Sequence, residues 1–133
     1  MTDRKTARPD SGNDLPSRPD ADNWEIQLRK GTLELAVLAA LGDRRLYGLE
    51  IIRRLEADSE LVVAEGTVYP LLNRLRALGW VVSEWVESDV GHPRKYYALT
   101  ARGRSRAIEM AQIWTRFSSS MTKLLAPLMK GKR

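Results

Sequence analysis

The 133-residue sequence contains no cysteine and a single histidine, His92. Without cysteine, the chain has no disulfide, no thiolate nucleophile and no cysteine-ligated metal, and one histidine excludes a multi-histidine metal site. The sequence also lacks a nucleophile with a nearby base and a glycine-rich phosphate loop. It therefore predicts a protein that is not an enzyme and that uses no cofactor.

Long apolar runs are missing as well. No stretch reaches the roughly 18 residues that a membrane-spanning helix needs, and the polar N-terminus is unlike a signal peptide. We therefore expect a soluble, cytoplasmic protein with no membrane partner. Aromatic residues make up only 7% of the chain. The core must then be built mainly from Leu, Val, Ile and Ala.

The charge is positive and unevenly distributed. The formal net charge is +5 and the sequence pI is about 9.8. The first 23 residues hold five Asp against four Arg and Lys, so the positive excess lies in the remainder. A small basic domain suits a polyanionic partner, most commonly nucleic acid, but a basic surface also aids solubility.

Hydrophobic periodicity predicts three helices in the first part of the chain. Residues 1–22 are rich in Asp, Arg, Pro and Ser, which predicts a disordered tail. Helices are expected over residues 25–41, 47–56 and 66–78. The third has a continuous apolar face made of Val68, Leu71, Leu72, Leu75 and Leu78. Gly79 follows it as a C-terminal cap.

The period changes after this helix. Residues 80–87 and 94–99 alternate as strands, and a turn cluster over residues 88–93 joins them into a hairpin. The linker between the second and third helices is long enough for a short edge strand at residues 61–63. Thr100 is the expected N-cap of a long helix over residues 101–126, which Pro127 is expected to stop.

The long last helix has an apolar seam. Its members recur at alternating steps of four and three residues, as in a heptad pattern: Ala107, Ala111, Trp114, Ser118, Met121, Leu125 and Leu128. A second stripe runs beside it: Met110, Ile113, Phe117 and Leu124. Since no later element is available to cover these stripes, we expect a two-fold homodimer through this helix. The candidate dimer residues are Ala111, Trp114, Phe117, Met121 and Leu125.

The order of elements is that of a winged helix-turn-helix, a mainly α fold with a β-hairpin wing (α+β). Residues 1–22 are expected to form the tail, residues 23–100 the winged helix DNA-binding domain, and residues 101–133 the dimerisation helix with a short basic tail. Double-stranded DNA is the expected partner. A winged helix that serves as a protein-interaction module, without sequence-specific DNA binding, is the alternative.

The third helix supplies candidate DNA contacts. The major groove of DNA admits one α-helix, whose exposed face must offer hydrogen-bond donors. Thr67 and Tyr69 lie near its N-terminus, and Asn73 and Arg74 follow further along the helix. The same residue types also occur on helix faces that are simply solvated.

The hairpin tip adds cations beside this helix. Its sequence includes His92, Arg94 and Lys95. Consecutive cations on a projecting turn suit contacts with phosphates or the minor groove, although they also protect an exposed strand edge from pairing. We interpret His92 as a turn residue or a further phosphate contact rather than a pH sensor.

Several motifs, in order and spacing, resemble the PadR-like transcriptional regulators. They are LRKGTLE at residues 28–34, YGLEI at 47–51, EGTVYPLLNRL at 65–75 followed by Leu78-Gly79, and GHPRKYYALT at 91–100 followed by Gly103. The resemblance covers roughly residues 28–125. With one C-terminal helix, the chain is similar to the shorter subgroup of the family.

The resemblance implies a homodimer that binds an inverted-repeat operator, usually as a repressor that a small effector releases. It places Tyr47, Thr67, Tyr69 and Pro70 at or beside the DNA. It also makes Arg94 and Lys95 wing cations. Trp114 falls where multidrug-sensing relatives stack flat aromatic compounds at the dimer centre, so a hydrophobic or aromatic effector is a candidate partner. A tryptophan on a heptad seam also fits plain dimer core.

Overall fold

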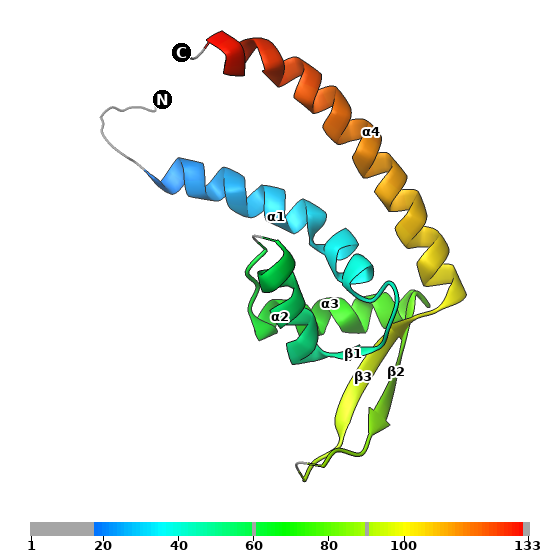
Figure 1. Cartoon of the computed structure of the whole chain (residues 1–133). Helices are drawn as coiled ribbons and strands as arrows, with labels where there is room; N and C mark the ends of the chain where they lie inside the picture. Colours follow the sequence, from blue (N-terminus) through cyan, green and yellow to red (C-terminus); the bar gives the residue numbers. More distant parts are fainter. Residues whose placement is uncertain (1–17, 60, 90, 132–133) are drawn as a thin grey trace, which may run out of the picture. The chain divides into compact units, whose positions relative to one another are not determined.

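The computed structural model describes residues 18–59, 61–89 and 91–131 (Figure 1). The elements are α1 (Arg18–Ala40), β1 (Leu46–Tyr47), α2 (Gly48–Asp58), α3 (Glu65–Ala77), β2 (Val81–Val86), β3 (Arg94–Leu99) and α4 (Ala101–Gly131). The chain divides into two compact units, residues 1–33 and 34–133. The second unit contains the last turns of α1 and every later element.

The predicted helices and hairpin are present with shifted ends. The first helix begins at Arg18, so residues 18–22 are helical and not part of a disordered tail. The remainder of the predicted tail, residues 1–17, lies outside the described residues. The second helix starts at Gly48 because Tyr47 is its N-cap, and the backbone N–H of Tyr47 donates to the Glu50 carboxylate at 3.1 Å.

The core lies where α2, α3 and the end of α1 meet the sheet. Four of the five residues predicted to form the apolar face of α3 are buried there: Val68, Leu71, Leu72 and Leu75. The fifth, Leu78, was wrongly included, because it follows the last residue of the helix and is 40% exposed. The other elements bury Val37, Leu38, Leu41, Leu46, Ile51, Ile52, Leu55, Val81 and Tyr97. The core is therefore aliphatic, with the Tyr97 ring as its buried aromatic among the described residues.

The sheet has three antiparallel strands in the order β1-β3-β2. The predicted edge strand at residues 61–63 is wrong: these residues are not in a strand, and Leu46–Tyr47 pairs with Tyr97 and Tyr96 instead. The reason is burial. Leu46 is 6% exposed where it pairs with Tyr97, whereas Val62 lies outside the sheet and is 65% exposed.

Two capping motifs join the end of α3 to the start of α4. Gly79 has a φ of 81°, and its N–H and that of Trp80 bond back to the Arg76 and Leu75 carbonyls at 2.9 and 3.0 Å. This pattern confirms the predicted C-terminal cap as a Schellman motif. Thr100 is the N-cap of α4, as predicted, because its hydroxyl accepts a hydrogen bond from the Gly103 N–H at 2.9 Å.

The last helix extends further than predicted. It continues through Pro127 to Gly131, so the expected stop at Pro127 is wrong. Proline removes one intrahelical hydrogen bond to the carbonyl four residues earlier. Here that carbonyl belongs to Lys123 on an exposed turn, where water can replace the lost donor. Among the described residues, no helix is both long and apolar enough to span a membrane.

Candidate nucleic-acid interface

The exposed face of α3 gathers most of the predicted helix contacts. An α-helix has 3.6 residues per turn, so the side of α3 opposite its four buried side chains is the one that carries Pro70 and Asn73. Thr67 and Arg74 then lie on one flank, and Tyr69 on the other. All five are exposed. One surface of one helix therefore carries these predicted residues.

The Tyr69 flank packs against the start of α2. A Cβ atom at Gly48 would collide with the Tyr69 ring, so the absence of a side chain there leaves room for the ring. Burial raises the pKa of the Tyr69 hydroxyl, and the nearby Glu65 carboxylate raises it further. The hydroxyl therefore stays protonated near neutral pH and can donate a hydrogen bond.

The same flank covers part of the sheet. Arg76 donates to the Ser83 hydroxyl at 3.4 Å. Burial raises the pKa of the Tyr97 hydroxyl, with a further increase from Tyr69 and a decrease from Arg76. The Arg76–Ser83 hydrogen bond places Arg76 over the Ser83–Tyr97 strand pair.

The opposite flank is tied to α1. The Arg74 guanidinium forms an ion pair with the Glu34 carboxylate at 2.8 Å. The Arg74 side chain remains 58% exposed, and that of Glu34 is 25% exposed. Sequence periodicity did not reveal this partner, because Glu34 is 40 residues away in the chain.

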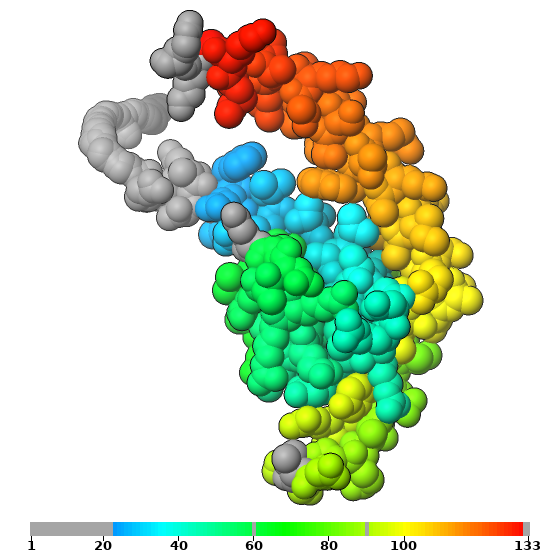
Figure 2. All heavy atoms as spheres, viewed as in Figure 1, coloured from blue at the N-terminus to red at the C-terminus, as the bar shows by residue number. Residues whose placement is uncertain are grey.

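The hairpin β2–β3 forms the wing, which extends away from α2 and α3 (Figures 1 and 2). Because side chains alternate along a strand, Arg94 and Lys95 lie on opposite faces of it. We call the face with Lys95 and Tyr97 the inner face, since it contains the buried Tyr97 ring beneath α3. The face with Arg94 and Tyr96 is the outer face. The two cations therefore cannot act as one cluster.

The outer face holds Arg94 in an aromatic cluster. The Arg94 guanidinium lies 4.5 Å from the centroid of the Tyr47 ring. That ring meets Tyr96 edge-on at 5.4 Å, and Arg45 lies 5.0 Å from the Tyr96 centroid. Arg45 is also paired with Glu84 at 3.2 Å. Tyr47, which the sequence suggested as a DNA contact, thus supports a wing cation.

The inner face and the tip carry the remaining predicted wing residues. Lys95 has its ammonium 5.7 Å from the centroid of the Trp85 ring, on the cross-strand neighbour. His92 is exposed at the tip, next to Gly91 with its φ of 105°. Within the part of the chain that the structure describes, no group of three or more His, Asp or Glu residues could hold a metal ion.

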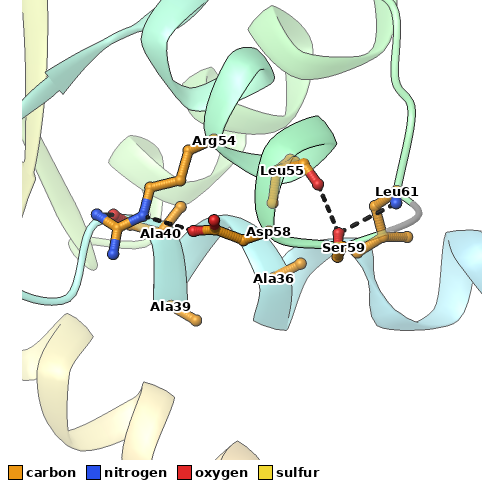
Figure 3. A pocket seen from close by; sticks show the side chains of 8 residues that line it. All are labelled: Ala36, Ala39, Ala40, Arg54, Leu55, Asp58, Ser59 and Leu61. Carbon is orange, nitrogen blue, oxygen red and sulfur yellow. Dashed lines mark hydrogen bonds and ion pairs between the residues drawn. The ribbon is translucent and has the colours of Figure 1, made fainter.

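A small hollow lies between the last turns of α1 and α2 (Figure 3). Its volume is about 270 Å³, and its lining is Ala36, Ala39, Ala40, Arg54, Leu55, Asp58, Ser59 and Leu61. At one end Arg54 pairs with Asp58 at 3.4 Å, and at the other Ser59 donates to the Leu55 carbonyl at 2.6 Å. The hollow is slightly below the size range of drug-sized ligand sites, about 300–1,000 Å³.

Sequence reasoning missed the residues that position the site. Gly48 makes room for Tyr69, Glu34 holds Arg74, and Arg45 extends the outer-face cluster. The Tyr47-Gly48 pair belongs to a motif that the sequence shows, but the sequence alone did not reveal why glycine is needed there. The other two contacts join residues far apart in sequence and leave no local signal.

The helix α3 has a polar exposed face, packs against α2 and is flanked by a basic hairpin. This arrangement defines a winged helix-turn-helix protein. Comparison with known proteins narrows this class. Residues 37–109 match the model of the Transcriptional regulator PadR-like family, which is more than half of the chain. The chain therefore belongs to the PadR-like family. It is a transcriptional regulator, which implies regulation through DNA binding.

Similar proteins carry consistent descriptions. A PadR-like transcription factor structure from Bacteroides fragilis is 40% identical, with 77% of this chain and 99% of that chain covered and a TM-score of 0.64. A PadR family transcriptional regulator structure from Eggerthella lenta is 33% identical, with 80% and 93% covered and a TM-score of 0.71. The Mycobacterium tuberculosis protein named Transcriptional regulator Rv3488 is 31% identical over 62% of this chain and 76% of its own length.

Proposed function

We propose that this protein is a homodimeric repressor that binds an inverted-repeat operator and is released by a small hydrophobic effector. We also propose that it is not an enzyme, in keeping with a family that is in general non-enzymatic. The observation that carries the proposal is the combination, on one unit, of the exposed polar face of α3 with the basic wing beside it.

In this proposal α3 enters the major groove. Asn73 faces directly outward and can offer its amide to a base edge, and Thr67 can contact a thymine methyl or a phosphate. Tyr69 donates its hydroxyl to a phosphate, and Pro70 allows close approach because it has no polar side chain. The N-cap of α3 is Ala64, with no side-chain capping bond, so first-turn amides can point at phosphate.

The wing then contacts the flanking backbone from two faces. Arg94 would reach phosphate from the outer face, where Tyr47 holds it, and Lys95 from the inner face. His92 at the exposed tip is a further phosphate contact. Each phosphate that a cation neutralises adds affinity and salt sensitivity.

Arg74 already has an ion-pair partner within the protein. Its proposed DNA contact competes with the Glu34 ion pair at 2.8 Å. The guanidinium is more than half exposed, and exposed ion pairs contribute only about 0–1 kcal/mol. A phosphate could therefore replace the carboxylate, or Arg74 could bind both at once through its several donors.

The homodimer would form through α4. Four of its large apolar side chains are strongly exposed: Trp114 by 43%, Phe117 by 56%, Met121 by 39% and Leu125 by 42%. Ala111 is exposed on the same helix and leaves room for close approach. A contiguous stripe of this kind is typical of an interface, and two-fold pairing covers it on both copies. The paired α3 helices would then enter major grooves about 34 Å apart.

The effector would bind between the two Trp114 side chains. Two indoles that face each other across a two-fold axis can sandwich a flat aromatic compound. The hollow beside α2 is small and has the Arg54–Asp58 ion pair at one end, which makes it less suited to such a compound. We therefore assign the effector to the dimer centre.

The test of DNA binding uses Tyr69→Ala and the double variant Arg94→Ala/Lys95→Ala. We expect both to weaken binding to operator fragments selected from genomic DNA, while sedimentation shows an unchanged dimer. The double variant should also reduce the salt slope by about two, one for each lost phosphate contact. Unchanged DNA affinity in both variants would contradict the proposal. It would also be contradicted if the chain bound a partner protein tightly and independently of salt but did not retain DNA, a result that would favour an interaction module.

The test of the effector site is a tryptophan fluorescence titration with flat aromatic compounds. Wild-type protein should respond more strongly than Trp114→Ala, because the quenched indole is missing in the variant. Trp24, Trp80 and Trp85 provide an equal background in both proteins. Equal responses would remove Trp114 from the effector site.

A further inference from the structure

The inner face of the wing consists of successive cross-strand pairs that become less covered with distance from the core. Val81 pairs with Leu99, and Val81 is 1% exposed. Ser83 pairs with Tyr97, which is 3% exposed. Trp85, in the next pair out, is 67% exposed. The Trp85 indole is thus exposed to solvent at the outer end of a face whose inner pairs contain buried side chains.

This bare pair continues the surface of α3. The Ser83–Tyr97 pair lies beneath α3, where Arg76 donates to the Ser83 hydroxyl and the Tyr97 ring is buried. The Trp85–Lys95 pair is one pleat further out, about 7 Å away along the strands. The α3 flank and the wing therefore form one corner.

Charges of both signs border this corner: the Glu65 carboxylate is near Tyr69, and the exposed Glu87 directly follows β2. Arg76 and Lys95 provide two cations, and Lys95 lies 5.7 Å from the Trp85 ring centroid. The carboxylate within β2, that of Glu84, is on the outer face and is paired with Arg45 at 3.2 Å. A surface that combines an exposed aromatic ring with cations suits a sugar–phosphate chain better than an apolar protein surface.

We propose that Trp85 packs its indole against the deoxyribose backbone of duplex DNA in this corner, where Lys95 pairs with an adjacent phosphate. The inference rests on the proposed DNA binding and adds a contact to it. The indole offers a flat apolar body for the sugar and an N–H donor for a phosphate oxygen. Trp85 thus fixes the strand that passes from the groove read by α3 to the groove beneath the wing.

The test measures fluorescence anisotropy of a labelled random duplex of about 30 base pairs at about 50 mM salt, because backbone contacts are independent of sequence. Trp85→Ala should weaken binding at least about tenfold, the size expected of a central interface tryptophan, with an unchanged salt slope. Lys95→Ala should instead lower the slope by about one. Val82→Ala is the matched control, since Val82 is exposed by 52% on the outer face of the same strand.

A second readout covers the case in which Trp85→Ala loses its fold. Trp85→Phe keeps an aromatic ring and should bind DNA within a few-fold of wild type. In wild-type protein the duplex should protect one tryptophan from acrylamide quenching, and this protected fraction should be missing in Trp85→Phe.

The outcomes separate the two proposals. Wild-type protein that binds the duplex while folded Trp85→Ala binds equally well overturns the inference and leaves the proposed function intact. Wild-type protein that ignores the duplex even at low salt overturns both.

Discussion

Replacing Gly48 with alanine should separate DNA binding from folding. The new methyl group would collide with the Tyr69 ring, which is 37% exposed and can rotate outward. A buried aromatic side chain removes about 150–250 Å² from water, so complete expulsion of this partly buried ring exposes roughly 120 Å². At about 25 cal/mol per Å², the loss of stability is at most about 3 kcal/mol.

Alanine offsets part of this loss through its higher helix propensity, by up to about 1 kcal/mol. We therefore expect Gly48→Ala to lower the free energy of unfolding by about 2–3 kcal/mol at most. DNA affinity should also fall, by about tenfold or more, because the displaced Tyr69 hydroxyl can no longer donate to a phosphate. Urea unfolding and DNA titration measure the two quantities on the same sample.

A double-mutant cycle tests the cause. In a Tyr69→Ala background there is no ring to displace. Adding Gly48→Ala to that variant should therefore lower neither its stability nor its DNA affinity. The matched control is Gly31→Ala, also in a helix, where an added Cβ meets nothing within 4 Å. If the effects of Gly48→Ala and Tyr69→Ala simply add, the collision is not the cause and the reasoning fails.

Three further substitutions test other parts of the structure. Gly103→Ala should cost about 2–3 kcal/mol of unfolding free energy, because its Cβ would overlap the backbone carbonyl of Trp80, which cannot rotate away; a denaturation midpoint equal to wild type would contradict this. Glu34→Gln should free Arg74 for phosphate and leave stability within about 1 kcal/mol, so a weakened DNA complex would show that the ion pair positions Arg74. Trp114→Ala should raise the dimer dissociation constant at least about tenfold in sedimentation equilibrium, whereas unchanged association would place the interface elsewhere.

The sequence determined the order and type of the main elements, because their signals are local. The apolar face of α3 follows from the spacing of Val68, Leu71, Leu72 and Leu75, and its end follows from the φ that Gly79 permits. The alternation of β3 likewise predicted its bounds. The motifs around residues 65–75 and 91–100 were sufficient to indicate the family.

Local signals failed where pairing or solvent decided the outcome. The edge strand formed at Leu46–Tyr47 and not at residues 61–63, since the choice depends on which segment reaches β3 and buries a side chain there. Pro127 did not end α4, because water can satisfy the carbonyl that proline leaves unpaired on an exposed turn.

The arrangement of the candidate interface was decided by tertiary structure alone. In the sequence Arg94 and Lys95 are adjacent basic residues. In the strand they lie on opposite faces, Arg94 beside Tyr47 and Lys95 beside Trp85. Arg74 meets Glu34 across 40 residues of chain. Such contacts depend on how distant segments pack, so a residue's neighbours along the chain carry no record of them.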